Sequence, residues 1–322
     1  MKVLLTGAAG FIGHHVAHRM LERGDEVVGL DNMSDYYSPA LKAARNDRLA
    51  RFERFSFLKL DLADHAALQS AGGLSDLDLV VHLAAQPGVR HSMENPFPYV
   101  EANVMGQVSL LEFAAKRGLP LVYASSSSVY GANEVVPFRE GDRVDRPISL
   151  YAATKRAGEL LAHSYRHTHG LRAVGLRFFT VYGRYGRPDM APWLFTDAIL
   201  HGKPITVFNN GEMERDFTHV SDVARGVTGA ADRILAAAGE MEPLYNLGDN
   251  RSVPLMDFIA LVEKAAGRKA KIEFKPRPPG DVPRTYADIA LAECDLGFKP
   301  TVVLEDGIAD FVEWFREEAN RF

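Results

Sequence analysis

Cysteine is almost absent from this sequence of 322 residues, because Cys294 is the only one. An internal disulfide is therefore excluded, and a single thiol fits a reducing compartment. Cys294 falls in a predicted helix and has no basic partner nearby in the sequence, so we assign it a structural role.

Long apolar runs and an excess of basic residues are also missing. No run approaches the ~18 apolar residues that a membrane-spanning helix needs. Because the first predicted strand begins at residue 2, we expect no signal peptide. Lysine and arginine number 37 against 42 aspartates and glutamates, for a formal net charge of −5. We therefore expect a cytoplasmic protein that binds neither membrane nor nucleic acid.

Two clusters look like sites but lack what a site requires. His14 and His18 have the spacing of a zinc pair, yet no intervening glutamate or evident third ligand accompanies them, so we predict no metal. Four arginines recur at every third residue with acidic residues among them, and we interpret them as a solvated helix face: Arg45, Arg48, Arg51 and Arg54.

The most informative stretch is the N-terminal MKVLLTGAAGFIG. Residues 3–5 form a short apolar run that suits a buried parallel strand, and residues 11–21 have helical spacing. Between them lie Gly7, Gly10 and Gly13, which permit a tight turn, close approach of a pyrophosphate and close packing of the helix on the strand. This pattern predicts a dinucleotide site at a helix N-terminus.

An acidic residue supports this interpretation. Residues 26–30 (EVVGL) read as a second buried strand, and Asp31 stands at its end, eighteen residues after Gly13. A carboxylate in this place accepts hydrogen bonds from an adenosine ribose and repels a 2′-phosphate. We therefore predict NAD rather than NADP as the cofactor.

Short apolar runs continue to alternate with helical stretches, which predicts an α/β fold with a doubly wound parallel (Rossmann) sheet. The further predicted strands span residues 55–60, 77–83, 119–124, 172–179 and 243–247. We expect an NAD-binding domain over residues 1–180, to which 221–250 return. A smaller interleaved C-terminal substrate domain would comprise 181–220 and 251–322.

Tyr151 and Lys155 are four residues apart at the start of a predicted long helix, so their side chains share one face. A nearby ammonium favours the phenolate, which would make the tyrosine a base near neutral pH. The pair follows the serine-rich end of the 119–124 strand, where a hydroxyl can bind the same substrate group.

In these features the sequence resembles the extended short-chain dehydrogenase/reductase family, and within it the nucleotide-sugar epimerases and dehydratases. The matching motifs run nearly end to end: TGAAGFIG, the acid at Asp31, HLAAQ at 82–86, SSSSVYG at 125–131, YAATK at 151–155, RFFTVYG at 177–183 and GEMERDFTHV at 211–220. The resemblance implies that Ser126, Tyr151 and Lys155 are catalytic.

The resemblance also implies which residues hold NAD. They are Gly7, Gly10, Phe11, Ile12, Gly13, Asp31, Asn32, Asp61, Leu62, Leu83, Ala84, Ala85, Gln86, Asn103, Ser125, Tyr151, Lys155 and Phe178. For a UDP-sugar substrate, it assigns Phe208 to the uracil and Arg215 to the pyrophosphate or its ribose. Arg277 and Asp281 complete that site, and Arg90 is a further anion ligand.

The greatest similarity is to UDP-glucuronate 4-epimerases. Dehydratases of the family carry Asp and Glu where this chain has Ser127 and Ser128, and UDP-galactose 4-epimerases usually carry Asn at Thr180. We hypothesise that these three hydroxyls and Arg187 hold a sugar carboxylate so that the 4-keto intermediate does not lose CO2.

The resemblance implies an isomerase that converts UDP-glucuronic acid into UDP-galacturonic acid, and a homodimer formed through two long helices. Three alternatives stay open: a UDP-glucuronate decarboxylase, a UDP-glucose/galactose 4-epimerase, and a non-catalytic dinucleotide-binding regulator on the same fold.

Overall fold

The structure is a computed structural model that describes residues 1–237, 239, 243–278 and 280–322. Its centre is a parallel sheet of seven strands: β1 Lys2–Thr6, β2 Glu26–Asp31, β3 Phe55–Lys59, β4 Leu79–His82, β5 Leu121–Ser126, β6 Ala173–Phe178 and β10 Leu244–Leu247. The strands lie in the order β10-β6-β5-β4-β1-β2-β3. The order reverses between β1 and β4, and in such sheets ligands bind at the carboxyl ends of the strands at this point.

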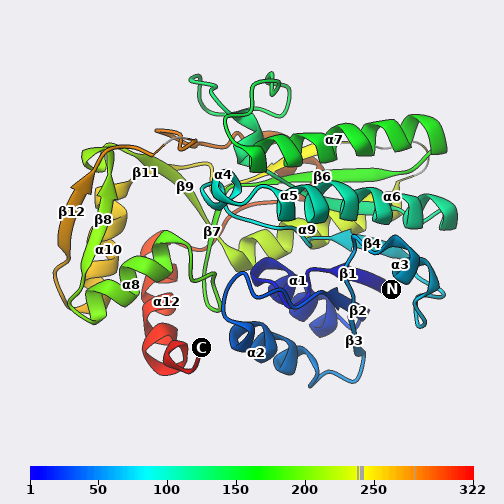
Figure 1. Ribbon diagram of the computed structural model, residues 1–322, viewed down its shortest axis with the longest axis horizontal. Helices are drawn as coiled ribbons and strands as arrows, with labels where there is room; N and C mark the ends of the chain where they lie inside the picture. Colours follow the sequence, from blue (N-terminus) through cyan, green and yellow to red (C-terminus); the bar gives the residue numbers. More distant parts are fainter. Residues whose placement is uncertain (238, 240–242, 279) are drawn as a thin grey trace.

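Helices cover both faces of this sheet (Figure 1). α1 Phe11–Glu22 and α9 Val220–Ala236 pack against each other on one face, and α3 His65–Ser70, α6 Gly106–Arg117 and α7 Leu150–His169 lie on the other. The strands supply apolar side chains to both layers, because Val3 and Leu5 join one core cluster and Leu4 joins the other. This arrangement confirms the predicted doubly wound α/β fold.

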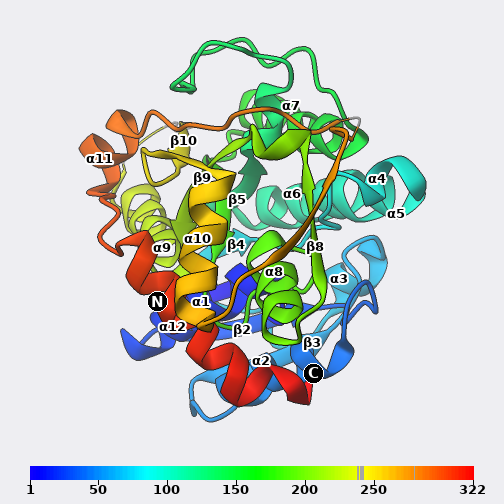
Figure 2. The ribbon, with the colours of Figure 1, turned by 90° about the vertical axis from the view of Figure 1, so that its left-hand side faces the viewer.

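A smaller unit lies beside the carboxyl ends of the strands (Figure 1). It contains a three-stranded sheet of β7 Thr180–Tyr182, β9 Glu214–His219 and β11 Ser252–Pro254, and a pair of β8 Pro204–Phe208 with β12 Lys271–Lys275. α8 Ala191–Leu200, α10 Leu255–Ala266 and α12 Leu304–Glu318 pack around them, as Figure 2 shows from the side of this unit. Its core includes Phe217 stacked on Phe258, with ring centroids 4.2 Å apart.

Shorter elements complete the chain: α2 Pro39–Leu49, α4 His91–Glu94, α5 Phe97–Val100, α11 Ala290–Leu296 and short 3₁₀ turns at Ser127–Tyr130, Asn209–Gly211 and Ala319–Arg321. Cys294 lies exposed on α11. Among the described residues, no helix is both long and apolar enough to cross a membrane. Residues 238 and 240–242, which belong to the predicted return of 221–250, lie outside the described residues.

One stretch with helical apolar spacing is not a single α-helix. Apolar residues recur at a helical period over residues 97–115, but the structure has α5, then a π-helical turn at Glu101–Met105, then α6. Single π-helical turns are typical of functional sites. This one carries Asn103, a predicted cofactor residue, and turns its side chain into the protein, where it is buried.

The prediction of a solvated arginine face is wrong for Arg45. α2 ends at Leu49, so the helix does not extend to Arg51 and Arg54, and Arg45 has no exposed surface. Its guanidinium instead donates hydrogen bonds to backbone carbonyls of two loops, including that of Ala9 at 3.1 Å. Such partners are distant in sequence, so residue spacing alone does not reveal them.

Candidate active site

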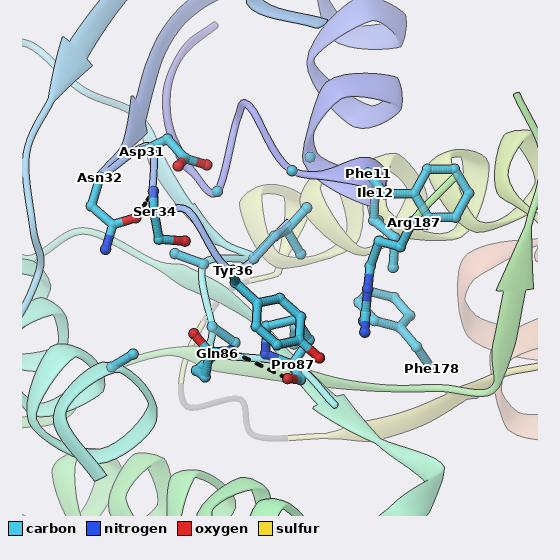
Figure 3. A pocket seen from close by; sticks show the side chains of 18 of the residues that line it. Phe11, Ile12, Asp31, Asn32, Ser34, Tyr36, Gln86, Pro87, Phe178 and Arg187 are labelled. Carbon is cyan, nitrogen blue, oxygen red and sulfur yellow. Dashed lines mark hydrogen bonds between the residues drawn. The ribbon is translucent and has the colours of Figure 1, made fainter. Parts of the chain in front are cut away.

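A long cleft runs along the carboxyl ends of β1, β2, β4, β5 and β6, and it is lined by most of the predicted cofactor residues. Those residues are Gly7, Gly10, Phe11, Ile12, Gly13, Asp31, Asn32, Asp61, Leu62, Leu83, Ala84, Ala85, Gln86, Ser125, Tyr151, Lys155 and Phe178. In Figure 3, Asp31, Asn32 and Ser34 lie at one end of the cleft, Arg187 and Phe178 lie at the other, and Tyr36 lies between them.

The turn between β1 and α1 has the shape that a dinucleotide needs. Gly7 has a φ of 75°, which favours glycine. A Cβ on Gly13 would lie 2.0 Å from the Gly7 carbonyl oxygen, so a larger residue would push the helix off the turn. Among the side chains that the structure describes, none caps α1, and its first turn carries no acidic residue. The first N–H groups of α1 are therefore available for an anion such as a pyrophosphate.

The acidic end of the cleft contains more than the predicted Asp31. One oxygen of this buried carboxylate accepts a hydrogen bond from the Met33 N–H at 2.8 Å and lies 3.5 Å from the Lys42 ammonium. Lys42 also donates to the Ser34 hydroxyl at 3.0 Å. Sequence reasoning missed Ser34 and Lys42, because no spacing rule links a residue of α2 to the end of β2.

Asn103 does not line the cleft but supports its wall. Its side-chain oxygen accepts a hydrogen bond from the Gln86 N–H at 2.7 Å, and its nitrogen donates to the Gln86 carbonyl at 3.0 Å. The same nitrogen is 3.1 Å from the Thr154 hydroxyl on α7. Asn103 therefore fixes the segment after β4, and its predicted contact with the cofactor stays a prediction.

The predicted catalytic residues come together where the cleft meets a second pocket, since Ser126 and Tyr151 line both. Burial raises the pKa of the Tyr151 phenol, and the hydroxyl of Ser126 and the guanidinium of Arg187 oppose that rise. The predicted effect of the Lys155 ammonium on the Tyr151 phenol stays a prediction.

Lys155 is buried, and its ammonium donates to the Ala124 carbonyl at 3.0 Å. Burial lowers the pKa of Lys155 from 10.5 to about 8, although the nearby carboxylate of Glu159 opposes the change. Glu159 was not predicted from sequence. It accepts hydrogen bonds from Ser125 at 2.6 Å and from Arg177 at 2.8 and 3.0 Å, all within the buried core. This network fixes the end of β5 beside α7.

The second pocket adjoins the cleft at Tyr151 and contains the residues of the predicted carboxylate clamp. Ser127, Ser128, Thr180 and Arg187 all line it. The pocket is also lined by Gly88, Arg215 and Asp281, which come from three different parts of the chain. We call it the sugar-side pocket from here on.

The predicted nucleotide residues form a chain of contacts beside this pocket. Arg215 donates to Asp281 at 2.6 Å, Arg90 donates to the other oxygen of Asp281 at 3.1 Å, and the Arg90 guanidinium lies 4.4 Å from the centre of the Phe208 ring. An aromatic ring and two guanidinium groups so arranged suit a base and a diphosphate. Arg277 is exposed and lines neither pocket.

Comparisons with known proteins agree with this geometry. The sequence profile of the NAD dependent epimerase/dehydratase family matches residues 3–248. The chain belongs to this family. It is 49% identical over 322 residues to an uncharacterized protein of Methanocaldococcus jannaschii, an alignment that covers 99% of this chain and 97% of that one.

Two further relatives of this epimerase/dehydratase chain are named as 4-epimerases of UDP-glucuronic acid. A probable UDP-glucuronate 4-epimerase of Rhizobium meliloti is 44% identical over 336 residues, covering 100% of this chain and 98% of that protein. The crystal structure of UDP-glucuronic acid 4-epimerase from Bacillus cereus, in complex with UDP-glucuronic acid and NAD, is 36% identical. It superposes with a TM-score of 0.91 over 98% of this chain and 99% of that chain.

Proposed function

We propose that this protein is an NAD-dependent isomerase that converts UDP-glucuronic acid into UDP-galacturonic acid through a transient 4-keto intermediate. The observation that carries the proposal is the meeting of the two pockets. Ser126, Tyr151 and Arg187 line both the cleft of the glycine turn and the sugar-side pocket. A substrate hydroxyl at this junction lies between the catalytic residues and the cofactor. NAD bound in the cleft supplies the hydride acceptor and returns the hydride, so no external oxidant is needed.

Tyr151 has the role of the base that removes the proton of the 4-hydroxyl. A tyrosine is usually protonated near pH 7, so its neighbours must favour the phenolate. The Ser126 hydroxyl and the Arg187 guanidinium act in this direction, as described above. Ser126 also holds the substrate hydroxyl, and Lys155 provides a buried positive charge one helical turn from the tyrosine.

The carboxylate clamp separates this proposal from a decarboxylase. A 4-keto uronic acid is a β-keto acid, and it loses CO2 when the bond from C5 to the carboxylate aligns with the ketone. Ser127, Ser128, Thr180 and Arg187 lie in one pocket, where three hydroxyls and a guanidinium can hold the carboxylate out of that alignment. Replacing Thr180 with valine should increase the CO2 released per turnover, and an unchanged CO2 yield would contradict the clamp.

The nucleotide is bound in this proposal by Phe208, Arg215, Asp281 and Arg90. The two arginines already share Asp281, so a diphosphate would compete with one carboxylate for two guanidinium groups. Arg277 is exposed, so its predicted role in the nucleotide site requires its side chain to move from the surface toward Asp281. The proposed division of the chain is that residues 1–180 with 221–250 bind NAD, and 181–220 with 251–322 bind the UDP-sugar.

We also propose a homodimer. α5 and the π-helical turn pack beside α7, and several large apolar side chains of these elements are exposed: Phe97, Val100, Met105 and Leu160. Phe97 leaves 74% of its surface accessible, which is unusual for a phenylalanine on a helix. Exposed apolar side chains of this kind suit a two-fold interface. Light scattering after gel filtration should give twice the mass of 35.5 kDa.

The test of the proposed activity is direct. The purified protein is incubated with UDP-glucuronic acid and NAD without a reductant, while products are followed by NMR and CO2 is trapped. UDP-galacturonic acid with little CO2 is the expected result. A UDP-pentose with stoichiometric CO2 would instead show a decarboxylase. No turnover of any UDP-sugar despite bound NAD would favour the non-catalytic regulator.

A further inference from the structure

The loop between β7 and α8 carries Arg187. Side chains of α1 and α2, which belong to the proposed NAD-binding part of the chain, donate hydrogen bonds to the backbone of this loop. Its carbonyl at Arg184 accepts a hydrogen bond from His15 Nε2 of α1 at 2.8 Å. The next carbonyl, of Tyr185, accepts from Arg45 at 2.6 and 3.2 Å, and a third bond from Arg45 reaches the Gly186 carbonyl at 3.2 Å. Consecutive peptide groups just before Arg187 are thus fixed by α1 and α2.

Arg45 connects this loop to the glycine turn. Its Nη1 donates to the Ala9 carbonyl at 3.1 Å and to the Tyr37 hydroxyl at 2.6 Å, while the rest of the guanidinium serves the carbonyls of the β7–α8 loop. The side chain has no exposed surface. Only a planar group with five donors can make all of these bonds at once, and a lysine ammonium cannot.

A second residue, Tyr36, contacts Asp189, which is the carboxylate that pairs with Arg187. Arg187 donates to both oxygens of Asp189, at 3.0 and 2.5 Å, in a bidentate ion pair. The Tyr36 hydroxyl, from the segment that precedes α2, donates to Asp189 at 3.1 Å. This tyrosine also abuts Gly88, where an added Cβ would lie 2.4 Å from its oxygen. Tyr36 therefore contacts both Asp189 and Gly88, and Figure 3 shows its ring beside Pro87 in the middle of the cleft.

We propose that Arg45 and Tyr36 are positioning residues that fix the Arg187 guanidinium against the sugar carboxylate, Arg45 through the loop backbone and Tyr36 through Asp189. The proposal rests on the proposed function. The sequence assigned no role to Tyr36 and placed Arg45 on a solvated helix face, and Arg45 does not line the sugar-side pocket. Their effect is to couple the glycine turn, which holds the cofactor, to the group that orients the substrate.

The consequence concerns which bond of the 4-keto intermediate breaks. If Arg187 is free to rotate, the bond from C5 to the carboxylate can align with the ketone. The electron pair of that bond then passes to the ketone as an enolate, CO2 leaves, and the enolate takes a proton from water. If Arg187 is fixed, the carboxylate stays out of alignment and the hydride returns to C4 instead. The ratio of CO2 to UDP-galacturonic acid thus reports the position of Arg187.

The test compares Arg45→Lys and Tyr36→Phe with a matched control, Arg51→Lys, whose arginine is exposed just beyond α2. Each enzyme is given UDP-glucuronic acid and NAD, and CO2 and UDP-galacturonic acid are measured together. This ratio does not depend on how much of the preparation is folded. We expect it to rise about threefold in Tyr36→Phe, which loses one hydrogen bond to a charged group, and about tenfold or more in Arg45→Lys. Arg51→Lys should match the wild type.

Wild-type ratios in both variants, with turnover intact, would overturn this assignment alone. Absence of turnover in the wild type would overturn the proposed function, and this assignment with it. If Arg45→Lys does not fold, Tyr36→Phe decides the question, because it removes only a hydroxyl. A raised KM for UDP-glucuronic acid with an unchanged product ratio would also contradict the assignment, since it would indicate weaker binding without a change in orientation.

Discussion

Replacing Lys155 with methionine is expected to abolish activity and yet stabilise the cofactor-free protein near pH 7. Burial lowers the pKa of this lysine from 10.5 to about 8. Each pKa unit corresponds to about 1.4 kcal/mol, so keeping the ammonium charged in the folded protein costs about 3 kcal/mol of stability. Methionine removes that cost and fills a similar volume. It also loses the hydrogen bond to the Ala124 carbonyl, worth about 1 kcal/mol, which leaves a gain of about 2 kcal/mol.

The stability gained in Lys155→Met should decrease as the pH rises. Below pH 8 the lysine is charged in both the folded and the unfolded protein, so its full cost is present. Between pH 8 and 10.5 the folded protein releases the proton first, and the cost falls until it disappears. The gain from Lys155→Met, measured by urea unfolding without NAD, should therefore be largest at pH 7 and less than half as large at about pH 9.5.

The matched control is Lys116→Met, because the Lys116 side chain is 63% exposed and pairs with Glu112 on the surface. Its effect should be close to zero at both pH values. The reasoning would be refuted by a Lys155→Met protein that is less stable than the wild type at pH 7. A gain of the same size at pH 7 and 9.5 would refute it as well, since methyl packing rather than charge burial would then be the cause.

Three other substitutions test the site. Tyr151→Phe should lower kcat about 10²- to 10⁴-fold, the usual contribution of a positioned base, with UDP-sugar affinity by calorimetry nearly unchanged; a loss below tenfold would assign the proton transfer to another group. Glu159→Gln leaves the guanidinium of Arg177 buried without its charged partner, so urea unfolding should show a loss of about 3–5 kcal/mol, and a loss under 1 kcal/mol would contradict the role of this pair. Asp31→Asn removes the carboxylate beside Lys42, so NADP affinity by fluorescence titration should rise about tenfold relative to NAD; an unchanged ratio would show that the acid does not select the cofactor.

The fold could be predicted because its signals are local. The glycine turn, the acid at the end of β2 and the alternation of short apolar runs with helical ones each depend on neighbouring residues. The interruption of the helix at Glu101–Met105 was not predictable in this way, since the apolar spacing continues through it. Asn103 of the π-helical turn contacts Gln86 and Thr154, and such tertiary contacts are not visible in the local sequence.

The candidate site was predictable to the extent that its residues end strands or begin helices. Asp31 and Ser126 stand at strand ends, and Tyr151 begins α7. Arg45 and Tyr36 reach the site through long side chains, and their partners there, the Tyr185 carbonyl and Asp189, are more than a hundred residues away. Nothing in the local sequence marks such partners, which is why a buried arginine was taken for a solvated one.

The most direct test of the proposed reaction uses UDP-glucuronic acid that carries deuterium at C4. The purified protein with NAD is incubated with it in ordinary water, and the product is examined by NMR and mass spectrometry. The account predicts UDP-galacturonic acid that retains the deuterium at C4 and releases almost no CO2, because the hydride leaves and returns within one closed site. Loss of the deuterium to water, or a UDP-pentose with stoichiometric CO2, would contradict it.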